Sequence, residues 1–467
     1  MRLELKEIIN FVQGEIIKTN QDQSSEENYF DFVITGVSTD SRKITKNQLF
    51  VPLVGENFDG HQFIQAAIEN GAIATFWNKN IPFPEDSKIN IPIVLVEDTL
   101  TALQQLAKEY KNIVKPIVVG ITGSNGKTTT KDLVASILKQ KYKLHKTHGN
   151  LNNHIGLPLT LLSMPMDTEV AVVEMGMSNK GEIEQLTLIA EPDVAVITNI
   201  GESHIEYLKT RENIAEAKLE IIKGLKDKGL LIANGDEPLL RNKLRSPENF
   251  RVKWVGNGEN NQFYLKEKKL VDAEKMVFVT SDEENYTLPL LGDHNVINAM
   301  LAIEVGRYLN VGIEKIKRGL AELQITGMRL EKQVAKNDAL ILNDAYNASP
   351  TSMKASLQLL KSFPSSLKKV AILGDMLELG NEAAEYHNEI GKLCASLNLD
   401  YLITTGLLGE LINSGALIAK MDSKAVIHLE IEKIPDFVLR NFDQNTVILV
   451  KASRGVHLER VIEGIKK

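Results

Sequence analysis

The sequence predicts an α/β fold in three domains, and three observations support that class. At 467 residues, the chain is longer than one hydrophobic core usually serves. Short apolar runs alternate with helical patterns, which is typical of mainly parallel sheets covered by helices. One run leads into a glycine-rich turn and then a helix, the arrangement of a phosphate-binding loop. Compositional shifts divide the chain into residues 1–98, 99–326 and 327–467.

The first block has the pattern of a small α/β module. Apolar residues recur at helical spacing over residues 5–12, and a second helix is predicted over 63–70, directly before Gly71. The short apolar runs at 32–34 and 49–51 are the strand candidates.

The middle block is predicted to form a mainly parallel sheet around the phosphate loop. Its strand candidates are residues 117–121, 170–173, 194–197 and 230–233. A helix is expected from about residue 130 to 142, after the glycine-rich turn. Ligands of parallel sheets bind at the carboxyl ends of the strands. The polar residues that follow these strands are therefore candidates for chemistry.

The third block repeats the alternation, which predicts a second Rossmann-like domain. Its strand candidates are residues 339–342, 370–373, 401–404 and 447–450. A polar segment follows each candidate, and we expect these polar ends to face the phosphate loop across a cleft.

The glycine-rich turn is the most informative feature of the chain. Glycines let the backbone approach an anion, Lys127 adds a positive charge, and Thr128 offers a hydroxyl to Mg²⁺. The usual P-loop has four residues between its first glycine and the Gly-Lys pair, whereas five separate Gly120 from Gly126. The alternative is a plain strand-to-helix turn. The predicted ATP-binding residues of this loop are Gly123, Ser124, Asn125, Gly126, Lys127, Thr128 and Thr129.

Composition excludes several classes of partner. A formal net charge of −7 argues against broad binding to nucleic acid or anionic membranes, since both require a basic face. Charges interleave the first seven residues, and no apolar stretch approaches 18 residues, so we expect a cytoplasmic protein without stable membrane insertion. We also expect a monomer. The single cysteine, Cys394, shares a helical face with Ile390 and Leu397 and is expected to pack in a core.

Five polar positions outside the loop are further candidates. Glu174 and His204 each follow a predicted strand, and a carboxylate and an imidazole at neighbouring strand ends suit Mg²⁺ or its waters. The alternative for His204 is a loop histidine that only forms hydrogen bonds. Lys218 has the spacing of a helical lysine beside carboxylates, which alone favours a solvated ion pair. Asn295 and Asn298 share a helix face, which suits capping or adenine contact.

Together these motifs resemble one family, the ATP-dependent Mur ligases that build the peptide of the bacterial cell-wall precursor. In the middle block the resemblance rests on residues 121–129, 149–158, 174–176, 203–204, 217–220 and 294–299. Three N-terminal motifs are similar to the UDP-sugar module of the third and fourth ligases: 39–42, 49–53 and 59–61.

The third block is similar to the fourth ligase. The similarity rests on residues 343–350 and 373–380, with His387 downstream. The Asp-Asn-Pro-Arg motif of the diaminopimelate-adding third ligase is absent from the sequence. Two segments depart from the family pattern, because Asn-Ala-Asn-Pro reads Asn-Ala-Ser-Pro at 347–350 and Lys-Gly-Ser-Arg reads Lys-Ala-Ser-Arg at 451–454. Both changes swap small residues and leave the expected reaction class unchanged.

The resemblance implies a ligase that joins D-alanyl-D-alanine to UDP-N-acetylmuramoyl tripeptide through an acyl phosphate, using ATP and Mg²⁺. The implied catalytic residues are Lys127, Glu174, His204 and Lys218. Thr128 and Glu174 would hold one Mg²⁺, and His204 and a carbamylated Lys218 a second. Asn295 and Asn298 would face adenine, and Arg329 and Asp344 the phosphates and ribose. The implied substrate contacts are Ser41, Arg42, Asn150, Asn152, Asn153, Asn347 and Ser349.

Two rival functions are open at this level. One is another amide ligase of the superfamily, of the folylpolyglutamate or cyanophycin type, which residues 40–42 and 374–376 disfavour. The other is a regulator that binds ATP only as a conformational switch. It would bind ATP tightly without acceptor-dependent turnover.

Overall fold

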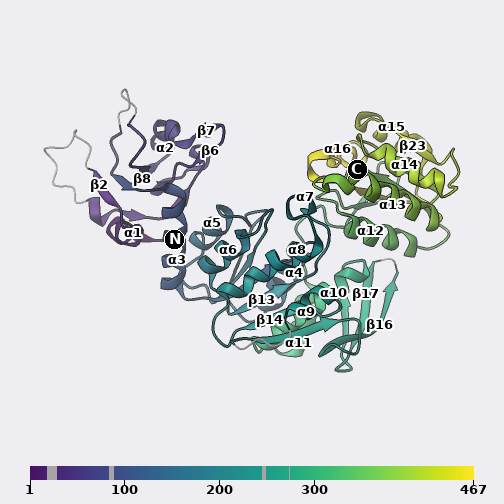
Figure 1. The fold of residues 1–467 in the computed structure, drawn as a ribbon, viewed down its shortest axis with the longest axis horizontal. Helices are drawn as coiled ribbons and strands as arrows, with labels where there is room; N and C mark the ends of the chain where they lie inside the picture. Colours follow the sequence, from purple (N-terminus) through teal and green to yellow (C-terminus); the bar gives the residue numbers. More distant parts are fainter. Residues whose placement is uncertain (18–28, 84–88, 245–248, 273) are drawn as a thin grey trace.

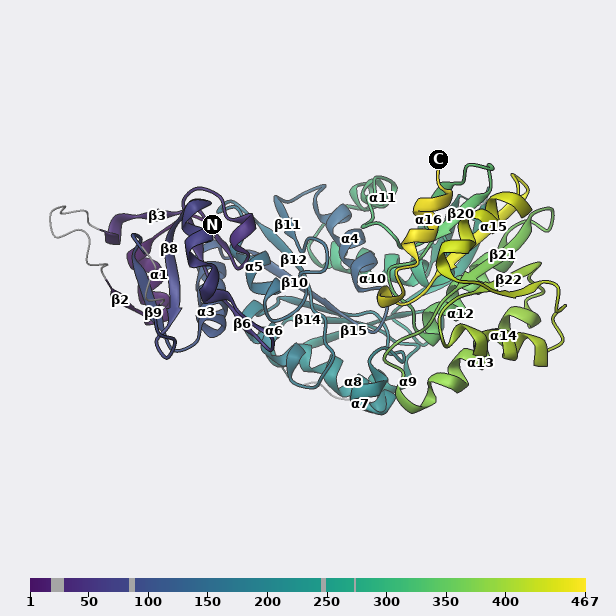
Figure 2. The same cartoon turned by 90° about the horizontal axis from the view of Figure 1, so that it is seen from above.

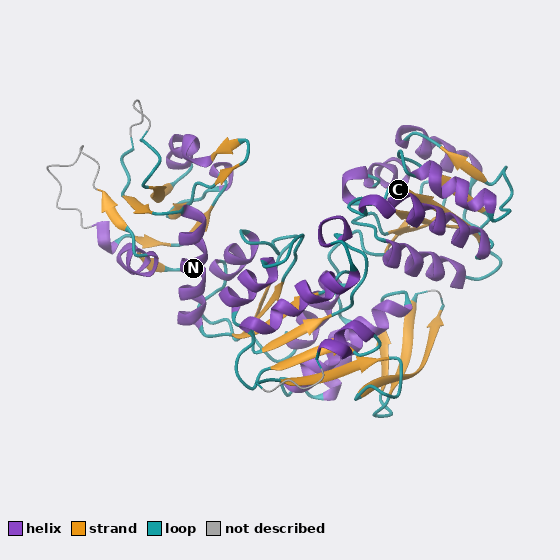
Figure 3. Ribbon diagram, in the orientation of Figure 1, coloured by secondary structure: helices purple, strands orange, loops and turns teal. Residues whose placement is uncertain are grey.

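The computed structural model describes the whole chain except residues 18–28, 84–88, 245–248 and 273. Three lobes follow one another in sequence order, and the central lobe lies between the other two in both views (Figures 1 and 2). Each lobe combines a sheet with helices (Figure 3). Within the described ranges, no helix combines the length and apolar character that a membrane span needs.

The N-terminal lobe is a five-stranded sheet with helices on both faces. Its strand order is β2 (Glu15–Ile17), β9 (Ile93–Val96), β8 (Ala72–Asn78), β5 (Gln48–Phe50) and β4 (Gly36–Ser38). Two short pairs flank it: β1 (Leu3–Glu4) with β3 (Val33–Ile34), and β6 (Val54–Gly55) with β7 (Phe58–Asp59). The predicted helices are confirmed as α1 (Leu5–Val12) and α2 (Ile64–Glu69). Helix α3 (Thr99–Val114) then packs against both α1 and the central lobe.

The central lobe contains a nine-stranded sheet. Its order is β11 (Leu144–Lys146), β12 (Val170–Glu174), β10 (Ile117–Thr122), β13 (Val194–Ile197), β14 (Leu230–Asn234), β15 (Arg251–Gly256), β16 (Phe263–Val271), β17 (Lys275–Thr280) and β18 (Asn285–Leu288). The four predicted strands are confirmed, and the sheet is parallel from β11 to β16. The antiparallel extension β16–β18 was not predicted. Its strands mix exposed charged residues with apolar ones, so they lack the continuous apolar run of a buried strand.

Helices cover both faces of this sheet. One face packs against α4 (Lys127–Leu138), α10 (Asp293–Tyr308) and α11 (Ile313–Ala321). The other packs against α3, α5 (Gly156–Leu162), α6 (Glu182–Ala190) and α8 (Arg211–Leu219). Short helices α7 (Ile205–Leu208) and α9 (Pro238–Lys243) lie in connections.

The helix after the glycine-rich turn differs from its predicted bounds of 130–142. It begins three residues earlier, at Lys127, because Gly126 adopts φ +79° at its N-cap and lets the first helical turn follow immediately. It ends at Leu138, where the chain turns toward β11. The correction places Lys127 and Thr128 in the first turn of α4, where free N–H groups favour an anion.

The C-terminal lobe is Rossmann-like, as predicted. Its strand order is β19 (Glu331–Val334), β20 (Leu340–Asn343), β24 (Thr446–Lys451), β21 (Lys368–Leu373), β22 (Tyr401–Thr404) and β23 (Val426–His428). The strands are parallel except β19. One face packs on α12 (Pro350–Ser362), α13 (Ala383–Ser396) and α14 (Gly409–Ile418), the other on α15 (Ile434–Asn441) and α16 (Glu459–Ile465). Cys394 is buried on α13, which confirms its packing role.

Asp132 on α4 accepts hydrogen bonds from two other segments of the chain, at Lys146 and at Thr326. Its Oδ1 accepts a hydrogen bond from Lys146 Nζ at 2.7 Å. Its Oδ2 accepts two from Thr326, one from the backbone N and one from Oγ1, both at 2.9 Å. Thr326 begins the connection to the C-terminal lobe, in which Met328 and Leu330 adopt the left-handed region at φ +61° and +53°. The carboxylate therefore fastens this connection to the helix that carries Lys127.

Candidate active site

A cavity of about 490 Å³ lies where the central and C-terminal lobes meet. It brings together most of the predicted site residues: Ser124, Asn125, Gly126, Lys127, Thr128, Thr129, Asn152, Asn153, Glu174, His204, Asn295, Asn298, Arg329, Asp344 and Asn347. Ser349 lines a smaller adjacent cavity of about 240 Å³, which His204 and Asn347 also line. The remaining predicted residues line neither cavity: Ser41, Arg42, Gly123, Asn150 and Lys218.

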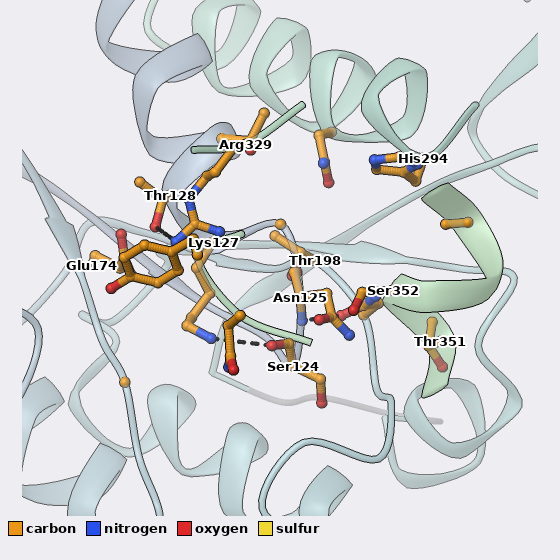
Figure 4. Close-up of a pocket in the computed structure, with 18 of the residues that line it drawn as sticks. Ser124, Asn125, Lys127, Thr128, Glu174, Thr198, His294, Arg329, Thr351 and Ser352 are labelled. Atoms are coloured by element: carbon orange, nitrogen blue, oxygen red, sulfur yellow. Dashed lines mark hydrogen bonds between the residues drawn. The ribbon is translucent and has the colours of Figure 1, made fainter. Parts of the chain in front are cut away.

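The phosphate loop has the geometry of an anion cradle. Gly123 adopts φ +148°, and a Cβ at this position would lie 1.9 Å from Thr198 Oγ1. Lys127 Nζ donates to the carbonyl oxygens of Gly123 at 2.8 Å and Ser124 at 3.2 Å, and Figure 4 shows it beside Ser124. Burial lowers the pKa of Lys127, and the nearby Glu174 opposes this shift.

Replacing Gly123 with alanine is expected to destabilise the protein and weaken ATP binding. The matched control is Gly181→Ala, because Gly181 has φ +88° but a Cβ there would meet no atom within 4 Å. The control should cost about 1–2 kcal/mol of unfolding free energy from backbone strain alone. Gly123→Ala should cost more, since Thr198 must also move. Equal unfolding midpoints in urea for the two variants would contradict the close approach.

Glu174 and His204 are not at neighbouring strand ends. Glu174 ends β12 and His204 follows β13, but β10 lies between these strands. The expectation is wrong because the strand that carries the phosphate loop is inserted between them. The carboxylate and the imidazole therefore flank the loop rather than adjoin each other.

The environment of Glu174 suits a hard cation. Its side chain is buried, and Oε1 accepts a hydrogen bond from Asn152 Nδ2 at 2.8 Å. Its Oε2 is buried without a hydrogen-bond partner among the described residues. A buried, unpaired carboxylate oxygen is costly, and Mg²⁺ is a partner that such an oxygen prefers. Thr128 on the adjoining helix turn supplies a second oxygen to the same cavity.

His204 contacts the C-terminal lobe. It adopts φ +65° directly before α7, and its Nδ1 lies 2.6 Å from Glu378 Oε2. The imidazole beside it lowers the pKa of the Glu378 carboxyl, so this group is ionised at neutral pH. His204 is therefore both a cavity residue and part of an interface between two lobes.

Lys218 is not a solvated ion pair. It is 1% exposed on α8, and no described carboxylate lies within ion-pair distance of its amino group. Spacing alone could not show that this helix face is covered. Burial lowers the pKa of Lys218 well below its usual value, the Lys127 ammonium lowers it further, and Glu220 opposes both. The neutral amine is thereby favoured.

Arg329 reaches over the phosphate loop from the start of the C-terminal lobe. Its Nη2 donates to Thr128 Oγ1 at 2.9 Å, and Figure 4 shows the two side chains in contact. Its guanidinium also lies over the Tyr346 ring, 4.2 Å from the centroid. The first turn of α4 is thus linked directly to the segment that enters the C-terminal lobe.

Asp344 is held by two donors that were not predicted as site residues. Its Oδ2 accepts hydrogen bonds from Lys451 Nζ at 2.5 Å and Ser356 Oγ at 2.7 Å. Lys451 follows a predicted strand, and so does Tyr346, the ring under the Arg329 guanidinium. The rule that ligands bind at strand ends could therefore have identified both residues. Ser356 lies within α12 and had no such signal.

Asn295 and Asn298 share one face of α10, as expected. Asn295 Nδ2 donates to Leu291 O at 2.8 Å, and Asn298 Nδ2 donates to Asn295 Oδ1 at 3.2 Å. Asn298 also lies against the phosphate loop, because a Cβ on Gly126 would come within 2.7 Å of its Oδ1. The pair thus joins α10 to the loop.

The predicted substrate residues divide between lobes. Ser41 is buried in the N-terminal lobe, and Arg42 is exposed and hydrogen-bonded to Asp40. Ser349 caps α12, and its Oγ donates to Asn125 Oδ1 at 3.2 Å, across the interface with the central lobe. The predicted substrate residues of the N-terminal lobe and those around the cavity therefore belong to lobes with separate sheets.

A buried histidine supports the loop 374–380, which carries Glu378. His387 is fully buried; its Nε2 accepts a hydrogen bond from Met376 N at 2.9 Å, and its Nδ1 donates to Ala383 O at 2.6 Å. This pattern requires a neutral ring. Burial lowers the pKa of His387 accordingly.

His387 is expected to make stability fall in mild acid. Since its folded pKa lies below the unfolded value of about 6.5, its stabilisation is present above that value and is lost as pH falls through the folded pKa. His387→Gln should reduce the loss of unfolding free energy between pH 7.5 and 5, because glutamine gains no proton in this range. Equilibrium unfolding at both pH values checks this. An unchanged pH dependence in the variant would contradict it.

The fold and the cavity define a class of protein. The phosphate loop and the Glu174 carboxylate, which suits a cation, face the strand ends of the Rossmann-like C-terminal lobe. This arrangement is expected of an ATP-dependent enzyme that holds two reactants between its domains and joins them. Residues 33–111, 121–306 and 328–454 match, respectively, the descriptions "Mur ligase family, catalytic domain", "Mur ligase middle domain" and "Mur ligase, glutamate ligase domain".

Known proteins narrow the class to one family. The chain is 46% identical to the UDP-N-acetylmuramoyl-tripeptide–D-alanyl-D-alanine ligase of Bacillus subtilis, covering 99% of this chain and 98% of the relative. The Escherichia coli ligase of the same name is 33% identical, with 94% and 95% covered. The MurF crystal structure from Acinetobacter baumannii has a TM-score of 0.86 at 29% identity, covering 99% and 98%. Thermotoga maritima MurF, solved with ADP, has a TM-score of 0.80 at 33% identity, covering 92% and 96%. The chain belongs to the Mur ligase family.

Proposed function

We propose that this chain is the ATP-dependent ligase that adds D-alanyl-D-alanine to UDP-N-acetylmuramoyl tripeptide. The products are UDP-N-acetylmuramoyl pentapeptide, ADP and phosphate, and the reaction is a step in peptidoglycan precursor synthesis. The observation that carries the proposal is similarity over nearly the full length to ligases named for this reaction. ATP and a UDP-linked substrate argue for the cytoplasm, and a monomer suffices because one chain supplies every predicted site residue.

The reaction has two steps, phosphoryl transfer to the tripeptide carboxylate and then amide formation. A carboxylate does not condense with an amine in water, so the tripeptide carboxylate first attacks the γ-phosphoryl group of ATP and the bond to ADP breaks. The amine of D-alanyl-D-alanine then attacks the acyl carbon, its nitrogen gives up a proton to solvent, and phosphate leaves from the tetrahedral intermediate. Lys127 and Arg329 line the cavity where charge on the transferring phosphoryl group builds up. Positioning and electrostatics are the main contributions that a protein makes to such transfers.

Magnesium is proposed at two places around the loop. Thr128 and Glu174 would hold one ion, and His204 with a modified Lys218 would hold the other. When bound, Mg²⁺ neutralises phosphate charge and helps to orient the phosphoryl group. Asn152 would keep Glu174 oriented through its hydrogen bond to Oε1.

The modification proposed for Lys218 is carbamylation. Carbon dioxide adds to a neutral amine, which releases one proton and leaves a carbamate with two oxygens. Burial and the neighbouring Lys127 both favour the neutral amine of Lys218. The modification would give an oxygen ligand where an ammonium would repel the cation.

The proposal is tested by measuring phosphate release with Mg-ATP and UDP-N-acetylmuramoyl tripeptide, with and without D-alanyl-D-alanine. We expect release that depends on the dipeptide and a product with the mass of the pentapeptide. Parallel reactions with glutamate as acceptor test the folylpolyglutamate-type alternative. ATP binding without release under any of these conditions would instead support the regulatory alternative.

A further inference from the structure

The loop 374–380 of the C-terminal lobe docks on the segment that carries His204. Glu378 makes two contacts there: its Oε2 lies 2.6 Å from His204 Nδ1, and its backbone O accepts a hydrogen bond from Glu206 N at 3.1 Å. The next turn of the loop is also close, because a Cβ on Gly380 would lie 3.3 Å from Glu206 Cα. The two lobes therefore meet through both backbone and side chain beside the cavity.

The two residues in contact are both held in an unfavourable backbone conformation. Glu378 has φ +61° and His204 has φ +65°. For residues other than glycine, this left-handed region is disfavoured because Cβ comes too close to the following carbonyl oxygen. Such conformations persist where the surroundings determine them, often at functional sites. Here, the loop is supported by the hydrogen bond that His387 accepts from Met376 N.

The contact decides which nitrogen of His204 faces the reaction. Nδ1 is buried and lies 2.6 Å from Glu378 Oε2, an ion-pair contact, and among the described residues it has no partner with hydrogen-bond geometry. Two unprotonated lone pairs would repel each other at 2.6 Å, so this distance favours a proton on Nδ1. No residue in the described part of the chain forms a hydrogen bond with Nε2, and His204 is among the residues that line both cavities. Nε2 is thus the nitrogen left for a ligand in the cavity.

We propose that Glu378 is a positioning residue for His204, fixing its tautomer and ring orientation through Nδ1. This inference rests on the proposed function for its role in catalysis. Because Glu378 belongs to the C-terminal lobe, this contact exists only while that lobe is docked. The position of one lobe thereby controls a residue on the other, and acyl-phosphate formation is coupled to the presence of the lobe that carries Asn347 and Ser349.

The kinetic test compares Glu378→Ala with Glu378→Gln. Both variants keep a Cβ, so the backbone strain is the same, but only glutamine retains an oxygen that accepts the Nδ1 proton. We expect Glu378→Ala to lower kcat about tenfold or more, as loss of a histidine's outer partner does at metal sites, with KM for ATP changed less than about twofold. Glu378→Gln should restore kcat to within about threefold of the unmodified protein. The control is Glu410→Ala, an exposed glutamate on α14 of the same lobe.

An unchanged kcat in Glu378→Ala would overturn the proposal, as would equal losses in the alanine and glutamine variants. A second measurement needs no substrate. Protein labelled with ¹⁵N-histidine should show Nδ1 of His204 protonated, with the signal assigned by His204→Gln, and Glu378→Ala should shift it toward the Nε2–H form. An identical His204 spectrum in Glu378→Ala would refute the positioning role. If the unmodified protein formed no pentapeptide, the proposed function would be wrong. The spectrum would still show whether Glu378 fixes the tautomer of His204.

Discussion

Replacing Lys127 with alanine is expected to lower ATP turnover roughly a thousandfold, the upper end of what one preorganised donor contributes to a transition state, and to abolish tight ATP binding. Lys127 begins α4, and its amino group donates to two carbonyls of the phosphate loop. Phosphate oxygens can take over these hydrogen bonds when ATP enters. Calorimetric titration with a non-hydrolysable ATP analogue and the phosphate-release assay measure the two effects.

The matched control for Lys127 is Lys139→Ala. Lys139 is an exposed lysine immediately after α4, so its removal changes the net charge equally without touching the cavity. It should leave both ATP affinity and turnover within about twofold, as expected of surface substitutions. Turnover retained by Lys127→Ala would refute the phosphate-site assignment.

Lys218→Ala is expected to lower ligation on the order of a hundredfold or more. Loss of an outer partner at a metal site already costs about 10–100-fold, and the proposed carbamate would touch the cation itself. The truncation also leaves space where a buried side chain was. Short carboxylates such as acetate should therefore enter and restore part of the activity by supplying the missing oxygens.

Two comparisons make the Lys218 result specific. Lys223→Ala removes an exposed lysine of the same region, paired with Glu184, and should retain normal activity with no response to acetate. In Lys218→Ala, rescue should saturate with acetate concentration while the unmodified protein is unaffected. Full activity of Lys218→Ala without bicarbonate or carboxylates would contradict a carbamate ligand.

The elements that could be predicted from sequence are those with strong local signals. Buried parallel strands such as β10 and β13 are continuous apolar runs, and the loop between β10 and α4 combines glycines with Lys127 in a pattern that few folds use otherwise. The strand-end rule also placed Glu174 and Asp344 near the cavity. These features depend on residues close together in the chain.

The features that escaped prediction depend on pairings between distant segments. The order of strands puts β10 between Glu174 and His204, and no local pattern encodes that order. The burial of Lys218 depends on what packs over α8, although its spacing is that of a solvated helix. Contact between His204 and Glu378 joins residues that are far apart in the chain and belong to two lobes. Such contacts require the tertiary structure.

The anchoring of Thr326 to Asp132 has a mechanical consequence. Both the backbone N and the hydroxyl of Thr326 donate hydrogen bonds to Asp132 on α4. In any rotation of the C-terminal lobe, Thr326 would therefore stay with the central lobe. The pivot must then fall between Thr326 and β19, in the short segment that includes Met328 and Leu330. Arg329 lies within this pivot and touches Thr128. A ligand that displaced Arg329 from Thr128 would therefore act on this connecting segment itself.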